Sequence, residues 1–425
     1  MSLKHETIFT LEATPVKFGA GASGDAGWEL RRLGARRVML VTDPGVAALG
    51  VPARIQRLIE SEGIEVVVFA DSRVEPTIDS LQRAAEFAVE HGVDGFVSVG
   101  GGSSIDTAKI ANLIATHPAP VMDYVNPPVG EGRQPPSPLM PHLAIPTTAG
   151  TGSEVSPAAV ITMGRTKATL VDYSLMPDMA IVDPTLTLSM PPAVTADTGI
   201  DALTHALEAV VSIFASPYTD AFCVQAARLI FDNLPRAYAD GDDLEARTAM
   251  ANAAAIAGLA FSNAFVGVNH ALAHAVGARF GIPHGRANAI FLPHVMRYNA
   301  ALPTKFMPAP GYSAYVAPDK YAQLGWILFG GRSDDERRER LLEHVDGLLQ
   351  AVDMPRSLKD AGVDETEFLT ALPELARTAF ADPSIRTNPR MPLLAEVVNL
   401  LRAGYRGAAP TTAATVASAP KRPRR

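Results

Sequence analysis

The periodicity of apolar residues changes near residue 187, and this change divides the chain into two parts. Before it, short runs rich in Val and Ile, such as RRVMLVTD and GFVSVGGG, alternate with helical stretches such as residues 77–91. Alternating strands and helices predict a parallel sheet in an α/β domain. From residue 187 to about residue 405 strand-like runs nearly disappear, and helical patterns replace them. We therefore predict an α/β domain at residues 1–187 and an all-α domain at residues 188–407.

The composition is consistent with two domains, and it restricts the kinds of partner that the protein is expected to bind. A chain of 425 residues is too long for one ordinary core, and 47% hydrophobic with 19% charged residues is typical of a globular enzyme. The net charge of −8 argues against nucleic acid or an anionic membrane as the main partner. The segment 408–425 is low in large apolar residues and ends in KRPRR, which predicts a disordered tail.

The cysteine content and the N-terminus predict a cytoplasmic protein. Cys223 is the single cysteine, so no internal disulfide can form, and this suits a reducing compartment. The N-terminal MSLKHETIFTLEATPV lacks the apolar stretch of a signal peptide. The uncharged segment 250–268 is long enough to span a bilayer, but it is Ala-rich and leads directly into a group of histidines. We interpret it as a helix buried in the protein.

Five side chains in the helical part have the spacing of a metal site. Asp201 and His205 lie four residues apart, His270 and His274 do the same, and His284 follows after a turn. Residues at i and i+4 project from one face of a helix. One carboxylate with imidazoles suits zinc or ferrous iron, whereas calcium and magnesium prefer oxygen ligands. Burying these groups unpaired would be costly, and a bound metal removes that cost.

Two polar loops in the α/β part have the character of a dinucleotide site. GFVSVGGGSSIDTAK reads as a strand, a turn at Gly100–Gly102 and a helix, and such a turn offers amide groups and a helix N-terminus to a pyrophosphate. The loop IPTTAGTGSEVSP is rich in hydroxyl and amide groups that suit phosphate and ribose oxygens. Asp43 follows the strand RRVMLVTD, where it either accepts the adenine-ribose hydroxyls, favouring NAD over NADP, or simply starts a turn before Pro44.

These motifs occur together, in order, in one known family. GGGSSIDTAK, IPTTAGTGSEVSP, MPDMAIVDPTLTLSMPP, GIDALTHALEA and NHALAH…GIPHGRANA resemble the iron-containing (group III) alcohol dehydrogenases, over nearly all of residues 10–405. The stretches DYSLMPDMAIVD, GLAFSNAFVGV and TNPRMPLL are similar to the alcohol dehydrogenase half of bifunctional aldehyde–alcohol dehydrogenases. The resemblance implies the dehydroquinate synthase-like fold of this family, with a catalytic cleft between an NAD-binding and a helical domain. Because the aldehyde dehydrogenase half is not in this sequence, we expect a stand-alone alcohol dehydrogenase.

The resemblance also implies a role for individual residues. His274 matches a histidine that does not bind the metal and lies near the nicotinamide, where it can relay a proton. The metal ligands, for Fe²⁺ or Zn²⁺, fall on Asp201, His205, His270 and His284. The NAD contacts fall on Asp43, Gly101, Gly102, Ser103, Thr147, Thr148, Thr151 and Lys167.

The implied reaction is hydride transfer between a short-chain primary alcohol and NAD, with a metal lowering the pKa of the alcohol. Phe261, Phe265 and Val266 are expected to line a small apolar pocket. Ser384 stands where many relatives have a cysteine, and the nearby Arg386 suits a substrate carboxylate. A hydroxy-acid dehydrogenase or hydroxyacid–oxoacid transhydrogenase of the 4-hydroxybutyrate type is therefore an alternative. A metallohydrolase would use the same ligands without NAD. We also expect a homodimer or higher homo-oligomer, paired through an edge strand.

Overall fold

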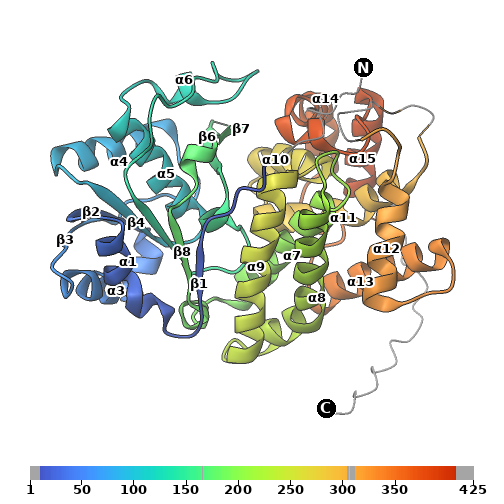
Figure 1. The fold of residues 1–425 in the computed structure, drawn as a ribbon. Coiled ribbons are helices and arrows are strands. Elements are labelled where there is room, and N and C mark those ends of the chain that lie inside the picture. The colour runs from blue at the N-terminus through green and yellow to red at the C-terminus, as the bar shows by residue number, and fades with distance from the viewer. Residues whose placement is uncertain (1–9, 165, 304–305, 307–311, 408–425) are drawn as a thin grey trace, which may run out of the picture.

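Six parallel strands form the sheet of the first half of the chain (Figure 1). The computed structural model describes residues 10–164, 166–303, 306 and 312–407, so the tail predicted at 408–425 lies outside the described residues. The strands follow the order β1-β8-β5-β4-β2-β3 across the sheet. Their bounds are β1 Val16–Phe18, β2 Arg37–Val41, β3 Glu65–Phe69, β4 Gly95–Gly100, β5 His142–Pro146 and β8 Met179–Val182.

The strand order places a crevice at the carboxyl ends of β2 and β4. From β2 the chain moves outward to β3 at one edge, and it then returns to β4 on the other side of β2. The connections after β2 and β4 therefore leave in opposite directions. In open parallel sheets, ligands bind at such a switch point. Asp43 follows β2 and Gly101 follows β4, so both predicted NAD residues lie at this crevice.

Helices cover both faces of this sheet, and their apolar sides form its core. The core includes Leu40, Ile55, Val97 and Ile145 on one side and Met39, Phe96, Ile110 and Leu113 on the other. The helices are α1 Ala26–Arg32, α2 Pro44–Ala48, α3 Val51–Glu60, α4 Ile78–Glu90, α5 Gly102–Thr116 and α6 Val121–Tyr124. Strands alternating with covering helices confirm the predicted α/β fold class of this half.

An antiparallel hairpin, β6 Ala158–Met163 and β7 Thr166–Val171, was not predicted as a separate sheet. Alternate residues of the hairpin, including Ile161 and Leu170, are buried against α4 and α5. The hairpin projects toward the helical half, where β7 contacts α10 (Figure 1). It thereby carries Lys167 away from the main sheet and toward the predicted metal residues.

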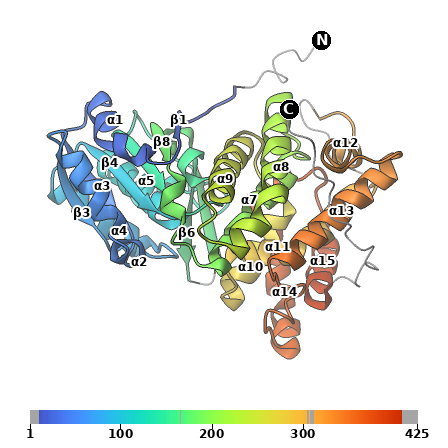
Figure 2. The same ribbon diagram turned by 90° about the horizontal axis from the view of Figure 1, so that it is seen from below.

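The second half consists of packed helices in the part of the chain that the structure describes. The helical patterns expected at residues 195–214, 221–233, 243–262, 271–277, 321–329 and 334–352 correspond to α7–α10, α12 and α13, whereas α11, α14 and α15 were not predicted. In Figure 2 these helices lie side by side, next to the α/β half. Their bounds are α7 Pro192–Ala209, α8 Pro217–Ala239, α9 Leu244–Ala264, α10 Val268–Phe280, α11 His284–Ala300, α12 Ala317–Phe329, α13 Asp334–Ala351, α14 Glu365–Ala381 and α15 Leu394–Arg406.

The uncharged segment 250–268 forms most of α9, and this helix lies inside the protein. Its alanines, such as Ala253, Ala257 and Ala260, are fully buried against α7 and α8. Among the described helices none is by itself long and apolar enough to cross a membrane. The pair α9 and α10 meets that criterion only together, with a bend of 107° between them. The burial of α9 matches the interpretation of this segment as a core helix.

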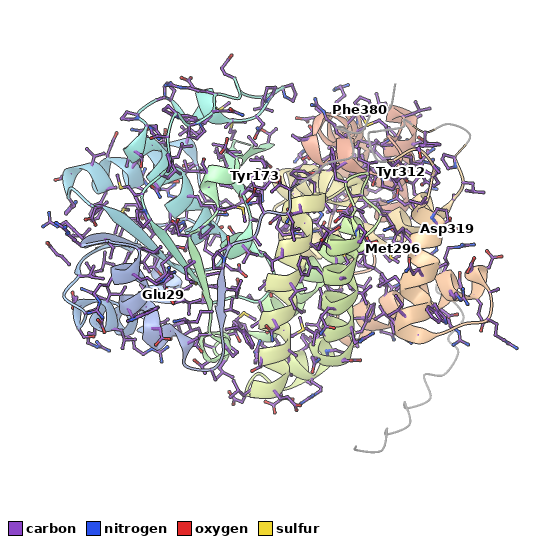
Figure 3. The ribbon with its side chains drawn as sticks, in the orientation of Figure 1. Glu29, Tyr173, Met296, Tyr312, Asp319 and Phe380 are labelled. Atoms are coloured by element: carbon purple, nitrogen blue, oxygen red, sulfur yellow. The ribbon has the colours of Figure 1, made fainter. Side chains whose placement is uncertain are left out.

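The two halves meet along α9. The backbone of Gly258 on α9 approaches the loop at residues 145–157 closely. A Cβ on Gly258 would lie 2.9 Å from Cα of Gly152 in that loop. Gly152 itself has φ +61°, a conformation that glycine adopts without strain. The hydroxyl of Ser262 donates to the carbonyl of Val155 at 3.0 Å, and Tyr173 Oη donates to the carbonyl of Ser262 at 3.2 Å. Figure 3 shows Tyr173 at this junction. These contacts fix the loop at residues 145–157, which belongs to the first half, to helix α9 of the second half.

Candidate active site

Three of the predicted metal ligands converge around one carboxylate oxygen. Asp201 lies on α7, His270 on the first turn of α10, and His284 is the first residue of α11. Oδ1 of Asp201 is 3.4 Å from Nε2 of His284 and 3.8 Å from Nε2 of His270. One donor atom from each of these three side chains lies within 4.8 Å of the other two. Each of the two predicted i, i+4 pairs contributes one residue to this group, Asp201 from α7 and His270 from α10, and folding brings α10 and α11 to α7.

The fourth predicted ligand, His205, lies beside this cluster and not within its 4.8 Å limit. Its Nε2 is 3.9 Å from Oδ1 of Asp201, one helical turn earlier on α7. The ring stacks on His270 with centroids 4.8 Å apart, and its centroid is 4.4 Å from that of Phe261. Nδ1 of His205 is buried without a hydrogen-bond partner among the described residues. Ring contacts, more than hydrogen bonds, therefore hold the imidazole of His205 against the cluster.

The electrostatics of the cluster fit a divalent cation. Asp201 is only 4% exposed, and this burial raises its pKa because a charged carboxylate is poorly solvated there. Burial likewise holds the pKa values of His270 and His284 well below the usual range, so both imidazoles are neutral. Neutral imidazoles have a free lone pair for a metal, and a cation would compensate the buried carboxylate. The donor set therefore suits zinc or ferrous iron.

His274 also lies beside the metal cluster, but its imidazole has a separate hydrogen-bond partner. Nδ1 of His274 is 2.8 Å from Oδ2 of Asp382, which precedes the short helix η5 Pro383–Thr387. The other side of the ring stacks on His284, with centroids 5.2 Å apart and planes at 15°. Contact with His274 holds the pKa of Asp382 below its usual value, although burial of the carboxylate opposes this. A carboxylate on one nitrogen leaves Nε2 as the free nitrogen of this ring.

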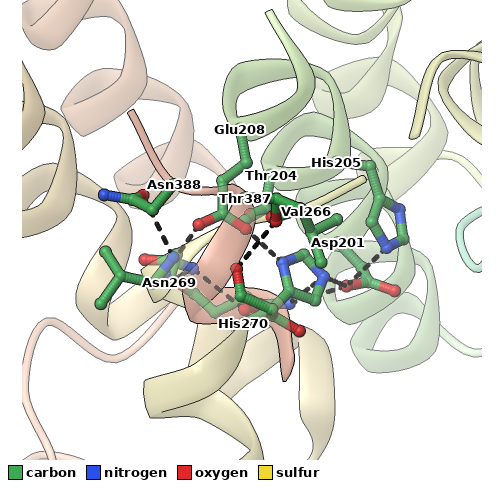
Figure 4. A network of polar contacts seen from close by, with 12 residues as sticks. Asp201, Thr204, His205, Glu208, Val266, Asn269, His270, Thr387 and Asn388 are labelled. Carbon is green, nitrogen blue, oxygen red and sulfur yellow. Dashed lines mark hydrogen bonds and ion pairs between the residues drawn. The ribbon is translucent and has the colours of Figure 1, made fainter. Parts of the chain in front are cut away.

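Two further polar residues at the cluster were missed from the sequence. Asn288, one turn after His284 on α11, donates from Nδ2 to Oδ1 of Asp201 at 2.8 Å. Glu208, one turn after His205 on α7, has Oε2 2.5 Å from Nδ1 of His270 (Figure 4). Burial raises the pKa of Glu208 to about 7. Both residues repeat the i+3 or i+4 spacing of the predicted ligands, and that signal could have found them.

The two predicted NAD loops pack against each other at the carboxyl end of β4. A Cβ on Gly102 would lie 3.0 Å from Oγ1 of Thr151, and one on Gly101 would lie 3.4 Å from Cγ2 of Thr148. The amide of Thr147 donates to the carbonyl of Gly100 at 3.0 Å. Helix α5 begins at Gly102. Its N-terminus and the amides of the glycine turn therefore face the loop at residues 145–157, which we call the threonine loop. This is the arrangement that a phosphate group requires.

The carboxylate of Asp43 caps helix α2 and also faces the start of helix α5. Its Oδ1 accepts hydrogen bonds from the amides of Gly45 at 2.9 Å and Val46 at 3.0 Å, and so caps α2. Its Oδ2 accepts one from Oγ of Ser104 at 3.3 Å. The two alternative interpretations of Asp43 are therefore compatible, because each uses a different oxygen. The neighbouring Ser103 directs its hydroxyl to the carbonyl of Val74.

Lys167, on β7, forms an ion pair with Glu75 and is close enough to the metal cluster for its charge to act there. Its Nζ is 3.2 Å from Oε1 of Glu75, two residues before Thr77, the N-cap of α4. Its positive charge opposes the rise that burial causes in the pKa of Asp201, and it adds to the lowering of the pKa of His284 by burial. The lysine side chain is 16% exposed, so it is not a freely solvated loop residue. The hairpin β6–β7, which the sequence did not predict, places it there.

The predicted pocket residues lie in the last turn of α9, at Phe261, and in the connection to α10, at Phe265 and Val266. Phe261 contacts His205, and Phe265 packs edge-on against Phe214 with centroids 5.8 Å apart. Phe265 has φ 62° and ψ −179°, a backbone conformation that is nearly restricted to glycine. The carbonyl of Val266 accepts a hydrogen bond from Thr387 of η5. Arg386, also on η5, is exposed to solvent, and Ser384 is half-buried.

Comparison with protein families matches both halves of the chain. Residues 13–184 match the model described as iron-containing alcohol dehydrogenase, and residues 195–405 match the C-terminal model of the Fe-containing alcohol dehydrogenase family. The chain belongs to the iron-containing alcohol dehydrogenase family. The family predicted from the sequence motifs is therefore confirmed.

Individual relatives fall into two groups by length. The chain is 38% identical over 395 residues to aldehyde-alcohol dehydrogenase 2 of Entamoeba histolytica, covering 89% of this chain but only 44% of that protein. It is also 38% identical to long-chain-alcohol dehydrogenase 1 of Geobacillus thermodenitrificans, covering 92% of this chain and 94% of that one. The chain thus spans less than half the length of the bifunctional relative.

Solved structures confirm the fold class. A 1,3-propanediol oxidoreductase matches with a TM-score of 0.85 and 34% identity, over 94% of this chain and 100% of the other. The sulfoacetaldehyde reductase of Bifidobacterium kashiwanohense, solved in complex with NAD⁺, matches with a TM-score of 0.79 and 28% identity over 93% and 98%. The α/β plus all-α architecture of these relatives is the predicted one.

Proposed function

We propose that this chain is an NAD-dependent, metal-dependent alcohol dehydrogenase that interconverts short-chain primary alcohols and aldehydes. The observation that carries the proposal is the convergence of His270 and His284 on Asp201 of α7, a helix that the loop at residues 145–157 contacts. A Cβ on Gly150 of this loop would lie 2.4 Å from Cβ of Thr198, one turn before Asp201 on α7. We place an NAD-binding domain at residues 1–187 and a catalytic helical domain at residues 188–407, with the reaction in the cleft where they meet.

Asp201, His205, His270 and His284 are the proposed metal ligands. The buried carboxylate, the neutral imidazoles and the unpartnered nitrogen of His205 support this set. A divalent ion held there would polarise the alcohol oxygen and make loss of its proton easier. Ferrous iron is the proposed native ion, and the same donors also accept zinc.

The proposed NAD contacts divide into three functions. Gly101, Gly102 and Ser103 at the start of α5, with Thr147, Thr148 and Thr151 opposite, are expected to bind the pyrophosphate and adjoining ribose oxygens. Oδ2 of Asp43, which accepts from Ser104, is expected to accept also from the adenine ribose, which favours NAD. Lys167 is expected to hold the nicotinamide ribose, next to the metal ligands. Bound NAD would accept the hydride from the alcohol carbon.

His274 is the proposed proton relay. Asp382 holds its Nδ1, so Nε2 remains free for the alcohol proton or for a ribose hydroxyl. The stacking of His274 on His284 keeps the relay next to the proposed ligands. Asp382 would stabilise the imidazolium that forms when the proton arrives.

The proposed substrate class rests on the residues that we expect to line the substrate pocket. Phe261, Phe265 and Val266 offer apolar surface, which suits a small neutral alcohol. Arg386 favours the alternative of a 4-hydroxybutyrate-type substrate, because it lies four residues after Asp382, the partner of His274. Relatives named for long-chain alcohols and for 1,3-propanediol add both to the substrates worth testing.

The test is NADH formation by iron- or zinc-loaded protein with ethanol, propanol, 1,3-propanediol, a long-chain alcohol and 4-hydroxybutyrate. We expect turnover of the neutral short alcohols. Turnover of 4-hydroxybutyrate alone, abolished by Arg386→Ala, would move the chain to the hydroxy-acid alternative. Bound metal with neither NAD binding nor turnover would contradict the dehydrogenase and favour a metallohydrolase.

We propose a homodimer in a reducing cytoplasm. The strand β1 is an edge of the sheet, and its Val16 and Phe18 are 38% and 39% exposed. An exposed apolar edge strand favours pairing with a second copy. Cys223, the single cysteine, is fully buried, and burial raises the pKa of its thiol strongly, so it is poorly reactive.

A further inference from the structure

Glu208 is a buried carboxylate that links the helix of Asp201 to the helix of His270. It is 3% exposed and lies two turns after Asp201 on the same helix, α7. Its two oxygens have different partners across the helix interface (Figure 4). Oε2 lies 2.5 Å from Nδ1 of His270, and Oε1 accepts from the amide of Asn269 at 2.7 Å.

The start of α10 is built to receive this carboxylate. Gly267, the N-cap, offers no side-chain hydrogen bond, so the first amides of α10 need acceptors from elsewhere. Glu208 supplies one for Asn269, and Oδ1 of Asn388 accepts from the amide of Val268 at 3.2 Å. A Cβ on Gly267 would lie 2.9 Å from Oε1 of Glu208 and 2.6 Å from Oδ1 of Asn388. A side chain at residue 267 would therefore displace both acceptors.

We propose that Glu208 is a positioning residue for the metal site, which keeps the proton of His270 on Nδ1 and leaves the lone pair of Nε2 facing Asp201. This inference rests on the proposed metal site. Oε1 of Glu208 already accepts from the amide of Asn269, and an N–H on Nδ1 of His270 lets Oε2 accept in the same way. Nε2 of the same ring is 3.8 Å from Oδ1 of Asp201. Carboxylates behind ligating histidines orient the ring and make it a better ligand.

Replacing Glu208 by glutamine should reverse this arrangement. The amide N–H of Asn269 is always a donor, so it retains the single amide oxygen of the glutamine. The glutamine NH₂ group then faces Nδ1 of His270, which must become the acceptor. The ring proton therefore moves to Nε2, the atom that faces Asp201, and that nitrogen no longer offers a lone pair to a metal.

The experiment compares Glu208→Gln with Glu154→Gln, the same change at a second buried glutamate that is also 3% exposed. Zn²⁺ affinity is measured by competition with a chromogenic chelator. Nitrogen-15 NMR of the metal-free proteins reports which nitrogen of His270 carries the proton. We expect Glu208→Gln to bind Zn²⁺ about 10- to 100-fold more weakly and to carry the proton on Nε2. Glu154→Gln should match the wild type in both measurements.

The outcomes separate this inference from the proposed function. Equal Zn²⁺ affinity of the wild type and Glu208→Gln would overturn the role of Glu208 while the metal site stands. A wild type that binds no Zn²⁺ would overturn the metal site and this inference with it. If Glu208→Gln does not fold, the metal-free wild type still decides: a proton on Nε2 of His270 contradicts the inference, and a proton on Nδ1 supports it.

Discussion

Three carboxylates, Asp201, Glu208 and Asp382, surround the histidines of the site. Oε2 of Glu208 and Oδ2 of Asp382 lie 2.5 Å and 2.8 Å from Nδ1 of their histidines, while Oδ1 of Asp201 faces Nε2 atoms at 3.4–3.9 Å. His270 and His274 each have a carboxylate at Nδ1, and His270 in addition faces Asp201 through Nε2. The contact of Nε2 with Asp201 therefore separates the proposed ligand His270 from the proposed proton relay His274.

Changing His274→Gln tests that separation. Because its Nδ1 is held by Asp382 outside the three-residue cluster, we expect bound metal to remain and kcat to fall about 10²-fold. Metal content is measured by elemental analysis and kcat by NADH formation. His270→Ala is the matched comparison and should lose metal. A loss of metal in His274→Gln equal to that in His270→Ala would make His274 a ligand.

Changing Asp43→Asn tests the proposed ribose contact without removing the helix cap. Asparagine caps helices as well as aspartate, so the hydrogen bonds to Gly45 and Val46 should remain. Removing the charge should raise kcat/KM with NADP relative to NAD about tenfold, because a carboxylate repels the 2′-phosphate. Asp43→Gly should shift the ratio in the same direction. An unchanged ratio in both variants would exclude Asp43 from the ribose site.

At the scale of elements, buried charges fix the threonine loop to α5. Nζ of Lys109 donates to the carbonyls of Ser156 and Ala158, both at 2.8 Å. Asp106 accepts from Oγ of Ser153 at 2.6 Å. Glu154 is buried beside this pair, and its burial raises its pKa to about 7, while the charge of Lys109 opposes that rise. The loop therefore has a stability that depends on pH.

Changing Glu154→Gln should remove this dependence. The folded-state pKa of about 7 exceeds the ordinary value of 4.5, so between these pH values the folded protein retains a proton that the unfolded chain has lost. The free energy of unfolding contributed by Glu154 is fully present below pH 4.5 and falls as the pH rises through 7. Relative to Glu154→Gln, the wild type should lose up to about 3 kcal/mol across this range. Denaturant titrations at several pH values measure the difference, and parallel curves would contradict it.

The elements also show what the sequence could and could not predict. Local spacing found Asp201, His205 and the glycine turn, because each motif lies within one helix or one turn. Asp382 could not be paired with His274 from spacing, since 108 residues separate them and only the packing of η5 on α10 joins them. The hairpin β6–β7 was missed because its short apolar runs resemble those of the main sheet. Glu208 was available at i+3 from His205 and was overlooked.

At the scale of the whole molecule, the reaction would depend on the two halves being held together. The contacts of Ser262 with Val155 and of Tyr173 with Ser262 join α9 to the threonine loop and to the segment before β8. These contacts fix the proposed NAD loops relative to α10, which starts four residues after α9 ends. The edge strand β1 lies on the surface of the first half, at the opposite edge of the sheet from β3.

Changing Val16→Glu tests the proposed dimer. A charge on the exposed face of β1 should weaken pairing with a second copy, so the mass measured by light scattering should fall from dimer to monomer. Val68→Glu is the matched control, because Val68 is equally 38% exposed on β3, the other edge strand. A wild type that is already monomeric, or an unchanged mass in Val16→Glu, would contradict pairing through β1.

The most direct test of the central claim is the activity of metal-free protein as Zn²⁺ or Fe²⁺ is added in measured amounts, with NAD and propanol present. If Asp201 and the histidines form the catalytic metal site, NADH formation should rise in proportion to bound metal and stop rising at one ion per chain. His270→Ala should remain inactive throughout the titration. NADH formation by the metal-free protein at the rate of the loaded protein would contradict the claim.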